Sequence, residues 1–418
     1  MTTPAGRSRR SFIASMSLLS AVPVSAAAWR LGPDRSTPQP PARHPGLAPR
    51  ADDFLFAPGV VYLQTGSLGP TPRPVMDRAI AAWKELEQNP VYYAYGPHEQ
   101  AMEETRAKVA ALVGCTKDEL LITRSTTEGM NWVAQGLGFK AGDRVLTTDQ
   151  EHPGGRVCWD YVARKHGVEL DVVPIRQGEH DAPALIDRFA SAITPRTRVL
   201  SFSHLLTSTG LRMPVAGLCA LARERGCLSV VDGAQAVGAI AVDVKALGCD
   251  VYVASGHKWL LAPAGTGLLY LSAAIGNAVD PIPLQAGRAV YSASSGVTNI
   301  PGVLAMATAV DYLHAIGVGA IERYNLALRQ RVFTALQSVP RVRIVSPPEG
   351  PAASPMLSYV LPDTVKSGDL YERLYRRHQV VVKVVPSQWF NGHRISTHLF
   401  NTPDDVEALG AALRAELT

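Results

Sequence analysis

Two apolar runs near the middle of the chain each lead to a charged side chain. The run at 230–232 is β-branched and ends in Asp232, and the run at 250–254 is followed closely by Lys258. Such runs are typical of buried parallel strands, and ligands of open α/β sheets bind beyond the carboxyl ends of their strands. We therefore expect Asp232 and Lys258 to lie at one edge of a mostly parallel sheet.

This pair of residues suits pyridoxal phosphate (PLP). The cofactor needs a lysine that forms a Schiff base, a carboxylate that keeps the pyridine nitrogen protonated, and hydroxyl or backbone donors for its phosphate. A single aspartate at a strand end is more often a cap, and a single lysine is more often solvated. Together, with Ser255 and His257 beside Lys258, they predict a PLP site in which Asp232 holds the ring nitrogen and Lys258 carries the cofactor.

The two segments also carry a family resemblance. Residues 231–236 and 255–258 resemble those of class V aminotransferases, the fold-type I family that includes cysteine desulfurases and isopenicillin N epimerase-like enzymes. The resemblance extends from about Tyr62 to about Leu413. It implies an α/β fold-type I PLP-dependent transferase, with a large domain built on a mostly parallel seven-stranded sheet flanked by helices and a smaller C-terminal α+β domain. It also implies a homodimer with shared active sites.

The N-terminus has the order of a twin-arginine signal. Arg9 and Arg10 precede a modest apolar stretch at 12–28 that closes on small residues. A transmembrane anchor is the alternative, but the stretch is short and weakly apolar for one. We expect an exported, periplasmic protein without a stable membrane anchor.

The rest of the chain reads as a linker followed by globular sequence. A Pro-rich segment without apolar periodicity follows the signal. The predicted organisation is a signal peptide at 1–28, a linker at 29–50, a large PLP-binding domain at 51–310, whose first residues could pack on the small domain, and a small C-terminal domain at 311–418.

Charge and cysteine content exclude some functions. The formal net charge is +5, and three of the arginines that contribute to it lie in the predicted signal. The remaining excess gives no reason to expect a nucleic acid or an anionic membrane as partner. Five cysteines show no metal-ligand spacing, so we expect buried thiols and no metal site.

A predicted strand at 119–123 leads into a helix start rich in hydroxyls. Hydroxyls and free amides at a helix N-terminus bind phosphate well. Capping by Ser125 or Thr126, with a nearby glutamate, is the plain alternative. The likeness of 126–131 to the family's phosphate segment assigns the hydroxyl contact to Thr127 and a backbone contact to Thr126.

The family resemblance implies that three further residues contact the cofactor ring. His152, which follows the predicted strand at 144–148, occupies the place of the family histidine that stacks on the cofactor ring, and a capping histidine is the alternative. Thr207 stands where desulfurase-like members usually carry an asparagine that touches the ring oxygen. Gln235 should reach the same oxygen from the other side, unless it only braces the turn.

Two more residues are assigned to a partner contact and to the substrate. Thr298, in the loop at 292–299, resembles the residue that family members extend to the partner subunit's phosphate, with a helix cap as the alternative. Arg394, in the segment at 393–402, matches the carboxylate-binding position. The planar guanidinium suits that task because it can meet a carboxylate with two parallel hydrogen bonds.

Apolar residues recur at helical spacing in two segments, 74–89 and 96–112. Both segments are predicted to be amphipathic helices. We expect the apolar stripe of the first, which includes Ile80 and Trp83, to pack in the core.

The reaction is less constrained than the cofactor. The first hypothesis is transamination or epimerisation of an α-amino acid, because the segment at 62–72 looks most like isopenicillin N epimerase-like members. Desulfurases carry a cysteine nucleophile on the loop before the carboxylate-binding arginine, and the stretch at 383–392 has none. A C–S lyase acting on a cysteine-derived substrate is the alternative, and a noncatalytic binding protein is the least favoured reading.

Overall fold

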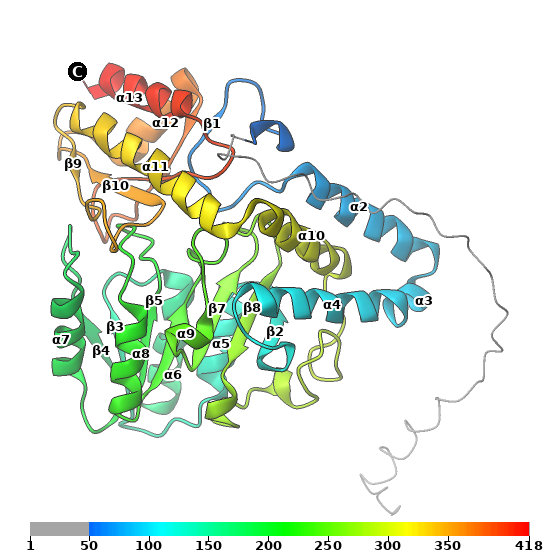
Figure 1. The fold of residues 1–418 in the computed structure, drawn as a ribbon. Coiled ribbons are helices and arrows are strands. Elements are labelled where there is room, and N and C mark those ends of the chain that lie inside the picture. The colour runs from blue at the N-terminus through cyan, green and yellow to red at the C-terminus, as the bar shows by residue number, and fades with distance from the viewer. Residues whose placement is uncertain (1–49, 418) are drawn as a thin grey trace, which may run out of the picture. The chain divides into compact units, whose positions relative to one another are not determined.

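The computed structural model describes residues 50–417. The predicted signal peptide and all but the last residue of the predicted linker lie outside the described residues. The predicted α/β class, with a large, mostly parallel sheet and a smaller C-terminal part, is confirmed (Figure 1).

The large sheet has seven strands in the order β2-β8-β7-β6-β5-β3-β4. Only β8 runs antiparallel to its neighbours, and the other pairs are parallel. The strands are β2 (Leu120–Thr123), β3 (Arg144–Thr148), β4 (Glu169–Val173), β5 (Thr197–Ser203), β6 (Leu228–Asp232), β7 (Val251–Ser255) and β8 (Gly267–Leu271).

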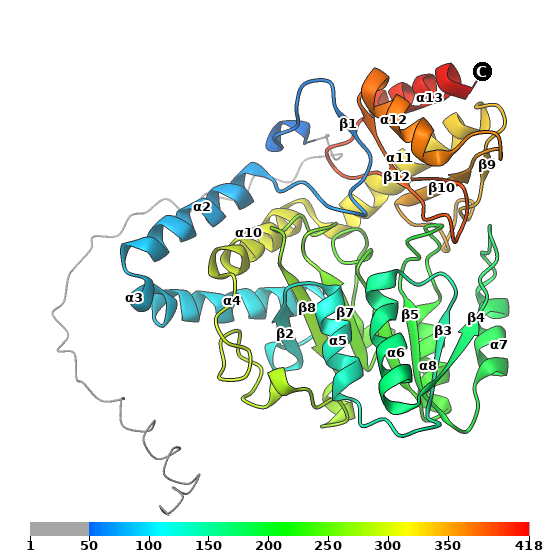
Figure 2. The same ribbon diagram turned by 180° about the vertical axis from the view of Figure 1, so that it is seen from behind.

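Helices cover both faces of this sheet (Figures 1 and 2). One face packs on α5 and α6, and the other packs mainly on α4, α7, α8, α9 and α10. Their bounds are α4 (Pro97–Leu112), α5 (Thr126–Gly136), α6 (Pro153–His166), α7 (Ala182–Ala192), α8 (Val215–Glu224), α9 (Val244–Leu247) and α10 (Ile300–Ile316).

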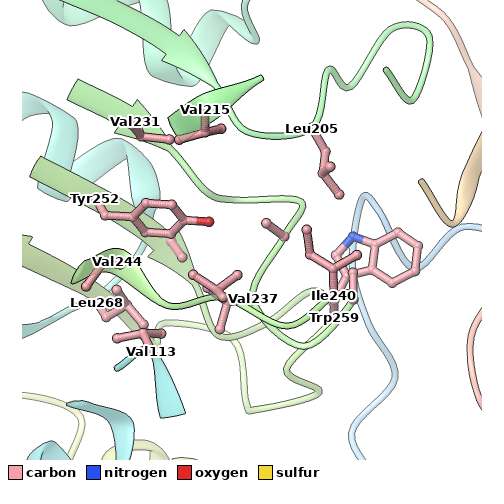
Figure 3. Packing of buried hydrophobic residues seen from close by; sticks show 14 of the residues in the cluster. Val113, Leu205, Val215, Val231, Val237, Ile240, Val244, Tyr252, Trp259 and Leu268 are labelled. Atoms are coloured by element: carbon pink, nitrogen blue, oxygen red, sulfur yellow. The ribbon is translucent and has the colours of Figure 1, made fainter. Parts of the chain in front are cut away.

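The near-continuous apolar strands follow from this double coverage. Successive side chains of a strand point to opposite faces, so Val230 packs on the α5 and α6 side whereas Val231 packs on the other. Figure 3 shows Val231, Tyr252 and Leu268, from three adjacent strands, on the same side of the sheet. Asp232 is the last residue of β6 and points to neither core but to the open edge where the site lies.

The C-terminal part is built on a second sheet. Four strands in the order β12-β13-β10-β9 pack with three helices around a separate apolar core. These elements are β9 (Arg343–Ile344), β10 (Met356–Val360), β12 (Lys383–Val384), β13 (Gly392–Ser396), α11 (Val318–Gln337), α12 (Ser367–His378) and α13 (Pro403–Leu417).

A parallel pair joins the beginning of the described chain to this C-terminal part. β1 (Val61–Tyr62) pairs with β11 (Val380–Val381). The apolar run at 380–385 therefore contains two short strands, β11 and β12, that belong to different sheets.

The predicted division of the domains after residue 310 falls inside α10. The helical axis instead changes direction by 74° between α10 and α11, where Gly317 has a φ of 91° that favours glycine. The domain division remains a prediction. Among residues 50–417, no single helix is long and apolar enough to cross a membrane, and α10 with α11 passes that test only as a bent pair.

The two predicted N-terminal helices form as α2 (Arg73–Gln88) and α4, with α3 (Pro90–Ala94) between them. The expectation that the apolar stripe of α2 lies in the core is wrong for Ile80 and Trp83, which are 47% and 58% exposed. The reason is that α2 packs on α10 along one side only. The consecutive helices α2 and α3 form a hairpin, and we call its exposed apolar residues the α2–α3 surface. It comprises Ile80, Trp83, Val91, Tyr92 and Tyr95.

The cysteines are free thiols, and the prediction that they are buried is confirmed except for Cys115, which is half-buried. The buried ones are Cys158, Cys219, Cys227 and Cys249.

Candidate active site

A cavity of about 350 Å³ lies at the carboxyl ends of the central parallel strands, between the large sheet and the β12–β13 pair. Ten of the eleven predicted site residues line it. They are Thr126, Thr127, His152, Thr207, Asp232, Gln235, Ser255, His257, Lys258 and Arg394.

Thr298 is the one that the fold does not bring to this cavity. It is half-buried in the loop before α10, and its carbonyl accepts a hydrogen bond from the Ile300 amide. Asn299, not Thr298, caps α10 by accepting from the Gly302 amide at 3.1 Å. The contact of Thr298 with a partner's phosphate stays a prediction.

Lys258 and Asp232 have side chains of opposite charge and line the same cavity. Burial lowers the pKa of Lys258 to about 8, although the nearby Asp232 carboxylate acts in the opposite direction. Burial raises the pKa of Asp232, and Lys258 counteracts that rise. Lys258 is half-buried, and its accessible surface faces the cavity. An amine of this kind is available as a nucleophile close to neutral pH.

The carboxylate of Asp232 is held by the turn that follows β6. Its Oδ1 accepts a hydrogen bond from the Ala234 amide at 2.9 Å. A Cβ at Gly155, in the first turn of α6, would lie 2.6 Å from its Oδ2. The glycine therefore lets α6 approach the carboxylate closely, and Oδ2 remains the oxygen available to a ligand.

A second buried acid, Glu151, supports this region and was not predicted. Its two oxygens accept hydrogen bonds from the Thr148 and Ser203 hydroxyls, each at 2.6 Å. Burial raises the pKa of Glu151 to about 7, and the charge of Asp232 adds to the effect while the two hydroxyls oppose it. The sequence offered a weak signal, since Glu151 directly precedes His152 after a strand.

His152 has the capping role that the sequence offered as the alternative, and its stacking on the cofactor ring stays a prediction. It is the N-cap of α6, and its Nδ1 accepts a hydrogen bond from the Gly154 amide at 3.0 Å. It also lines the cavity. Burial lowers its pKa to about 4, with a further contribution from the charge of Lys258. The imidazole is therefore neutral at physiological pH.

The N-terminus of α5 combines a capped end with polar groups that line the cavity, and its contact with a phosphate stays a prediction. Ser125 is the cap, with its hydroxyl accepting from the Glu128 amide at 3.2 Å. The Thr126 amide donates to the Ser255 hydroxyl at 2.9 Å, which fixes the end of β7 against the start of α5. Because Ser125 takes the capping role, the Thr127 hydroxyl stays available on the cavity wall.

Arg394 is a buried cation that has no counter-ion among the residues that the structure describes. Only 1% of its surface is exposed. Its guanidinium donates to the Thr207 hydroxyl at 2.5 Å and to the Thr207 carbonyl at 3.1 Å, and more weakly to the Ser67 hydroxyl at 3.4 Å. No carboxylate among residues 50–417 lies within 4.0 Å of it, and its Nε has no partner. Burial lowers its pKa to about 10. Such a site is costly unless an anion binds there.

Gln235 braces the wall of the cavity. Its Nε2 donates to the Gly66 carbonyl at 2.8 Å, and its Oε1 accepts from the Trp259 indole at 2.8 Å. The bracing alternative is therefore present in the structure. The contacts of Gln235 and Thr207 with the cofactor ring remain predictions, and the hydroxyl of Thr207 orients Arg394 in addition.

Several lining residues come from segments to which the sequence assigned no contact. Ser67 belongs to the N-terminal segment, and Lys383 and Trp389 belong to β12 and the loop after it. The Trp389 indole donates to the Asp149 carbonyl at 3.1 Å, so this loop is tied to the large sheet beside the cavity. Their only sequence signal was proximity to recognised segments.

Residues 61–409 match the family described as aminotransferase class-V. The match spans most of the chain, and the chain belongs to this family. It is a PLP-dependent enzyme of the class V aminotransferase type.

Known proteins similar to the chain agree with this assignment. It is 30% identical over 382 residues to isopenicillin N epimerase of Streptomyces clavuligerus, covering 87% of this chain and 96% of the epimerase. It is 34% identical over 339 residues to a cysteine desulfurase of Cronobacter sakazakii, covering 75% and 82%. Among solved structures, a C-DES variant with glycine covalently linked to the PLP cofactor superposes with a TM-score of 0.80 at 21% identity, covering 88% of this chain and 99% of that one.

The cavity itself fits PLP. A buried amine and a buried carboxylate with one available oxygen face the same space as the hydroxyl-rich start of α5. The glycine pair that opens α6 supports a close approach, because a Cβ at Gly154 would lie 2.5 Å from the Thr127 hydroxyl. In addition, His257 lines the cavity, and its Nδ1 is buried without a partner among residues 50–417.

Proposed function

We propose that this enzyme acts on an α-amino acid by transamination or epimerisation. The single observation that carries the proposal is Arg394, a buried guanidinium that has no counter-ion within the described range 50–417 and lines the same cavity as Lys258 and Asp232. A guanidinium held in this way recognises a carboxylate. Its position beside the reactive lysine selects a substrate that carries an amine next to the carboxylate.

The cofactor contacts divide among three groups of residues. Thr126, Thr127, Ser255 and His257 hold the cofactor's phosphate end, as their places around the start of α5 and the end of β7 suggest. Asp232 holds the proton on the ring nitrogen. His152 lies over the ring, and Thr207 and Gln235 approach the ring oxygen.

The chemistry then depends on proton movement at the substrate's Cα. When bound, PLP withdraws electrons from this carbon and so weakens its bonds. The Lys258 amine would be the base that removes the Cα proton and holds it for return, because its lowered pKa leaves part of the amine neutral near pH 7 to 8. Arg394 fixes the carboxylate and so sets which bond at Cα faces the lysine.

Transamination and epimerisation differ in where the proton is returned. A C–S lyase of a cysteine-derived substrate shares the first proton removal and is the alternative outcome. Cys249 is the last cysteine in the chain, so a mechanism that needs a cysteine on the loop before Arg394 is disfavoured.

Product analysis tests this proposal. The holoenzyme is incubated with a panel of amino acids, with and without a keto acid acceptor, and the products are analysed by chiral chromatography and mass spectrometry. A keto acid or an inverted amino acid supports the proposal, whereas pyruvate with released sulfide identifies the C–S lyase. Lys258→Ala is the inactive control, and Lys165→Ala, at an exposed position of α6, is the matched control.

The cofactor position has a separate test. Borohydride reduction followed by peptide mapping should place the pyridoxyl mass on Lys258. A pyridoxyl mass on another lysine, or no bound cofactor, would refute the site assignment.

We also propose that the α2–α3 surface is a homodimer interface. It gathers exposed apolar and aromatic side chains over one hairpin, and such a patch is typical of an interaction site. Light scattering tests this: Trp83→Asp should shift a dimer toward monomer. Tyr375→Asp, which changes another exposed aromatic residue, on α12, should not. A monomeric native protein refutes the proposal.

Export by the twin-arginine pathway is the remaining proposal. The motif lies at Arg9 and Arg10, and this pathway carries folded proteins, which suits an enzyme that binds its cofactor before export. Cell fractionation should find the protein in the periplasm, and changing both arginines to lysine should retain it in the cytoplasm. Unchanged export of that variant would contradict the assignment.

A further inference from the structure

Lys383 places a second cation in the wall of the same cavity. It lies on β12 directly opposite Arg394 on β13. Residues directly opposite in an antiparallel pair project from the same face of the sheet, with Cβ atoms about 5 Å apart. Both side chains line the cavity. Like charges in such positions destabilise the pair, so this arrangement favours binding of anions.

Lys383 has no counter-ion in the part of the chain that the structure describes. Among residues 50–417, no carboxylate lies within 4.0 Å of its Nζ, and its side chain makes no hydrogen bond. Burial and the charge of Arg394 both lower its pKa. The lysine is half-buried, so contact with water only partly compensates its charge.

The two acids near the cavity are already engaged. Asp232 is bound by the Ala234 amide and faces α6 and Lys258. Glu151 is bound by the Thr148 and Ser203 hydroxyls. Both belong to the large sheet and its loops, whereas Lys383 and Arg394 belong to the four-stranded sheet.

The cofactor does not account for Lys383 either. The phosphate of the cofactor is assigned to the start of α5, and its ring nitrogen is assigned to Asp232, both on the large-sheet side of the cavity. Arg394 is matched by the α-carboxylate of the substrate. In this arrangement, neither the cofactor nor the α-carboxylate of the substrate supplies a negative charge to Lys383.

We propose that Lys383 binds an anionic group on the side chain of the substrate, so that the enzyme acts on acidic α-amino acids. This inference rests on the function proposed above. A lysine suits the task because its ammonium is a mobile point charge that accepts an acid group without requiring bidentate geometry. The close spacing of Lys383 and Arg394 fits two acid groups of one small molecule, as in aspartate or glutamate.

Pairs of amino acids that differ only in the side-chain charge test this proposal. Aspartate is compared with asparagine, and glutamate with glutamine, in the wild-type holoenzyme and in Lys383→Met, Lys383→Gln and Lys383→Arg. Two quantities are measured: the dissociation constant, from the change in cofactor absorbance on binding, and kcat/KM. Lys366→Met removes one exposed charge of the same C-terminal part and is the matched control.

We expect the wild type to favour at least one acid over its amide by about tenfold or more, the range for a hydrogen bond to a charged group. Lys383→Met and Lys383→Gln should abolish this preference while changing the amides little. Lys383→Arg should keep most of it, and Lys366→Met should keep all of it. An unaltered cofactor spectrum in each variant shows that the PLP site is intact.

Three results would overturn the inference. Equal losses for acid and amide would assign Lys383 to the α-carboxylate together with Arg394. A preference that survives in Lys383→Met would exclude the contact, and a wild type that prefers amides would exclude acidic substrates. If no amino acid alters the cofactor spectrum of the wild type, the proposed function itself fails, which is a distinguishable outcome.

A readout without turnover supplements these measurements. Glutarate carries two acid groups and butyrate only one, so glutarate should raise the Tm of the wild-type holoenzyme more than butyrate does. The difference should vanish in Lys383→Met and persist in Lys366→Met. Equal stabilisation of the wild type by the two acids would contradict the proposal.

Discussion

Gly155 faces Asp232 so closely that a Cβ at position 155 would lie 2.6 Å from Asp232 Oδ2. The carboxylate has little freedom to move, because it is buried and its Oδ1 is bound by the Ala234 amide. The glycine thus allows the first turn of α6, with His152 as its cap, to share one cavity with the strand-end aspartate.

Gly155→Ala should therefore weaken PLP binding. Replacing a helical glycine by alanine ordinarily stabilises a protein by up to about 1 kcal/mol. Here the added methyl group displaces the Asp232 carboxylate, and overpacking of about 1–3 kcal/mol corresponds to a loss of about fivefold to 150-fold in affinity. An absorbance titration of the apoenzyme with PLP measures this affinity. Gly368→Ala, in α12, where a Cβ meets nothing within 4 Å, is the control, and normal affinity of Gly155→Ala would contradict the argument.

The covalent attachment of PLP should depend on pH through Lys258. Burial lowers the pKa of this amine to about 8, so the neutral, nucleophilic fraction rises as the pH increases through about 8. The initial rate of attachment to apoenzyme, followed by absorbance, should rise over the same range and then level off. Nα-acetyl-lysine, as a free control, should require a pH near 10.

Two substitutions should move this midpoint in opposite directions. The Asp232 carboxylate favours the charged lysine, so Asp232→Asn should shift the midpoint to lower pH. The Arg394 charge disfavours the charged lysine, so Arg394→Ala should shift it to higher pH. A wild-type midpoint near 10, or shifts of the opposite sign, would show that Lys258 is not the buried amine described here.

Asp232→Asn should reduce turnover far more than cofactor binding. The amide keeps the shape of the side chain but removes the charge that holds a proton on the ring nitrogen. We expect kcat to fall about tenfold to a hundredfold or more, the range for losing a hydrogen bond between charged groups. Steady-state kinetics and a PLP titration together provide the measurement. Near-normal kcat would mean that another residue protonates the ring.

The strands and the residues at their ends could be predicted from the sequence because their signals are local. A β-branched run followed by Asp232 or Lys258 specifies both a buried strand and the position of its polar end. Nine of the ten predicted residues that line the cavity follow strands of the large sheet, and the rule that parallel strands bring their carboxyl ends to one edge of a sheet places them together. Arg394 comes from β13 of the other sheet and was found through the family resemblance.

The remaining contacts depend on how distant segments pack. The contact of Ser67 with Arg394 joins segments far apart in the chain, and no local pattern encodes it. The exposure of Trp83 has the same origin, since helical periodicity identifies an apolar stripe but not what covers it. The imidazole of His152 both caps α6 and lines the cavity, so the capping alternative does not exclude the predicted contact with the cofactor ring.

Arg394→Ala should chiefly raise KM for amino acids. The guanidinium holds the carboxylate in ground and transition states alike, so its removal should cost about 2–4 kcal/mol in kcat/KM. Arg394→Lys should recover only part of this loss, because a point charge cannot reproduce bidentate geometry. The cofactor absorbance should stay unchanged in both variants, since Arg394 is bound by Thr207 and Ser67 and is assigned to the substrate alone. Loss of the cofactor, or normal binding of amino acids, would transfer the carboxylate contact to Lys383 and remove the basis for assigning that lysine to a side-chain acid.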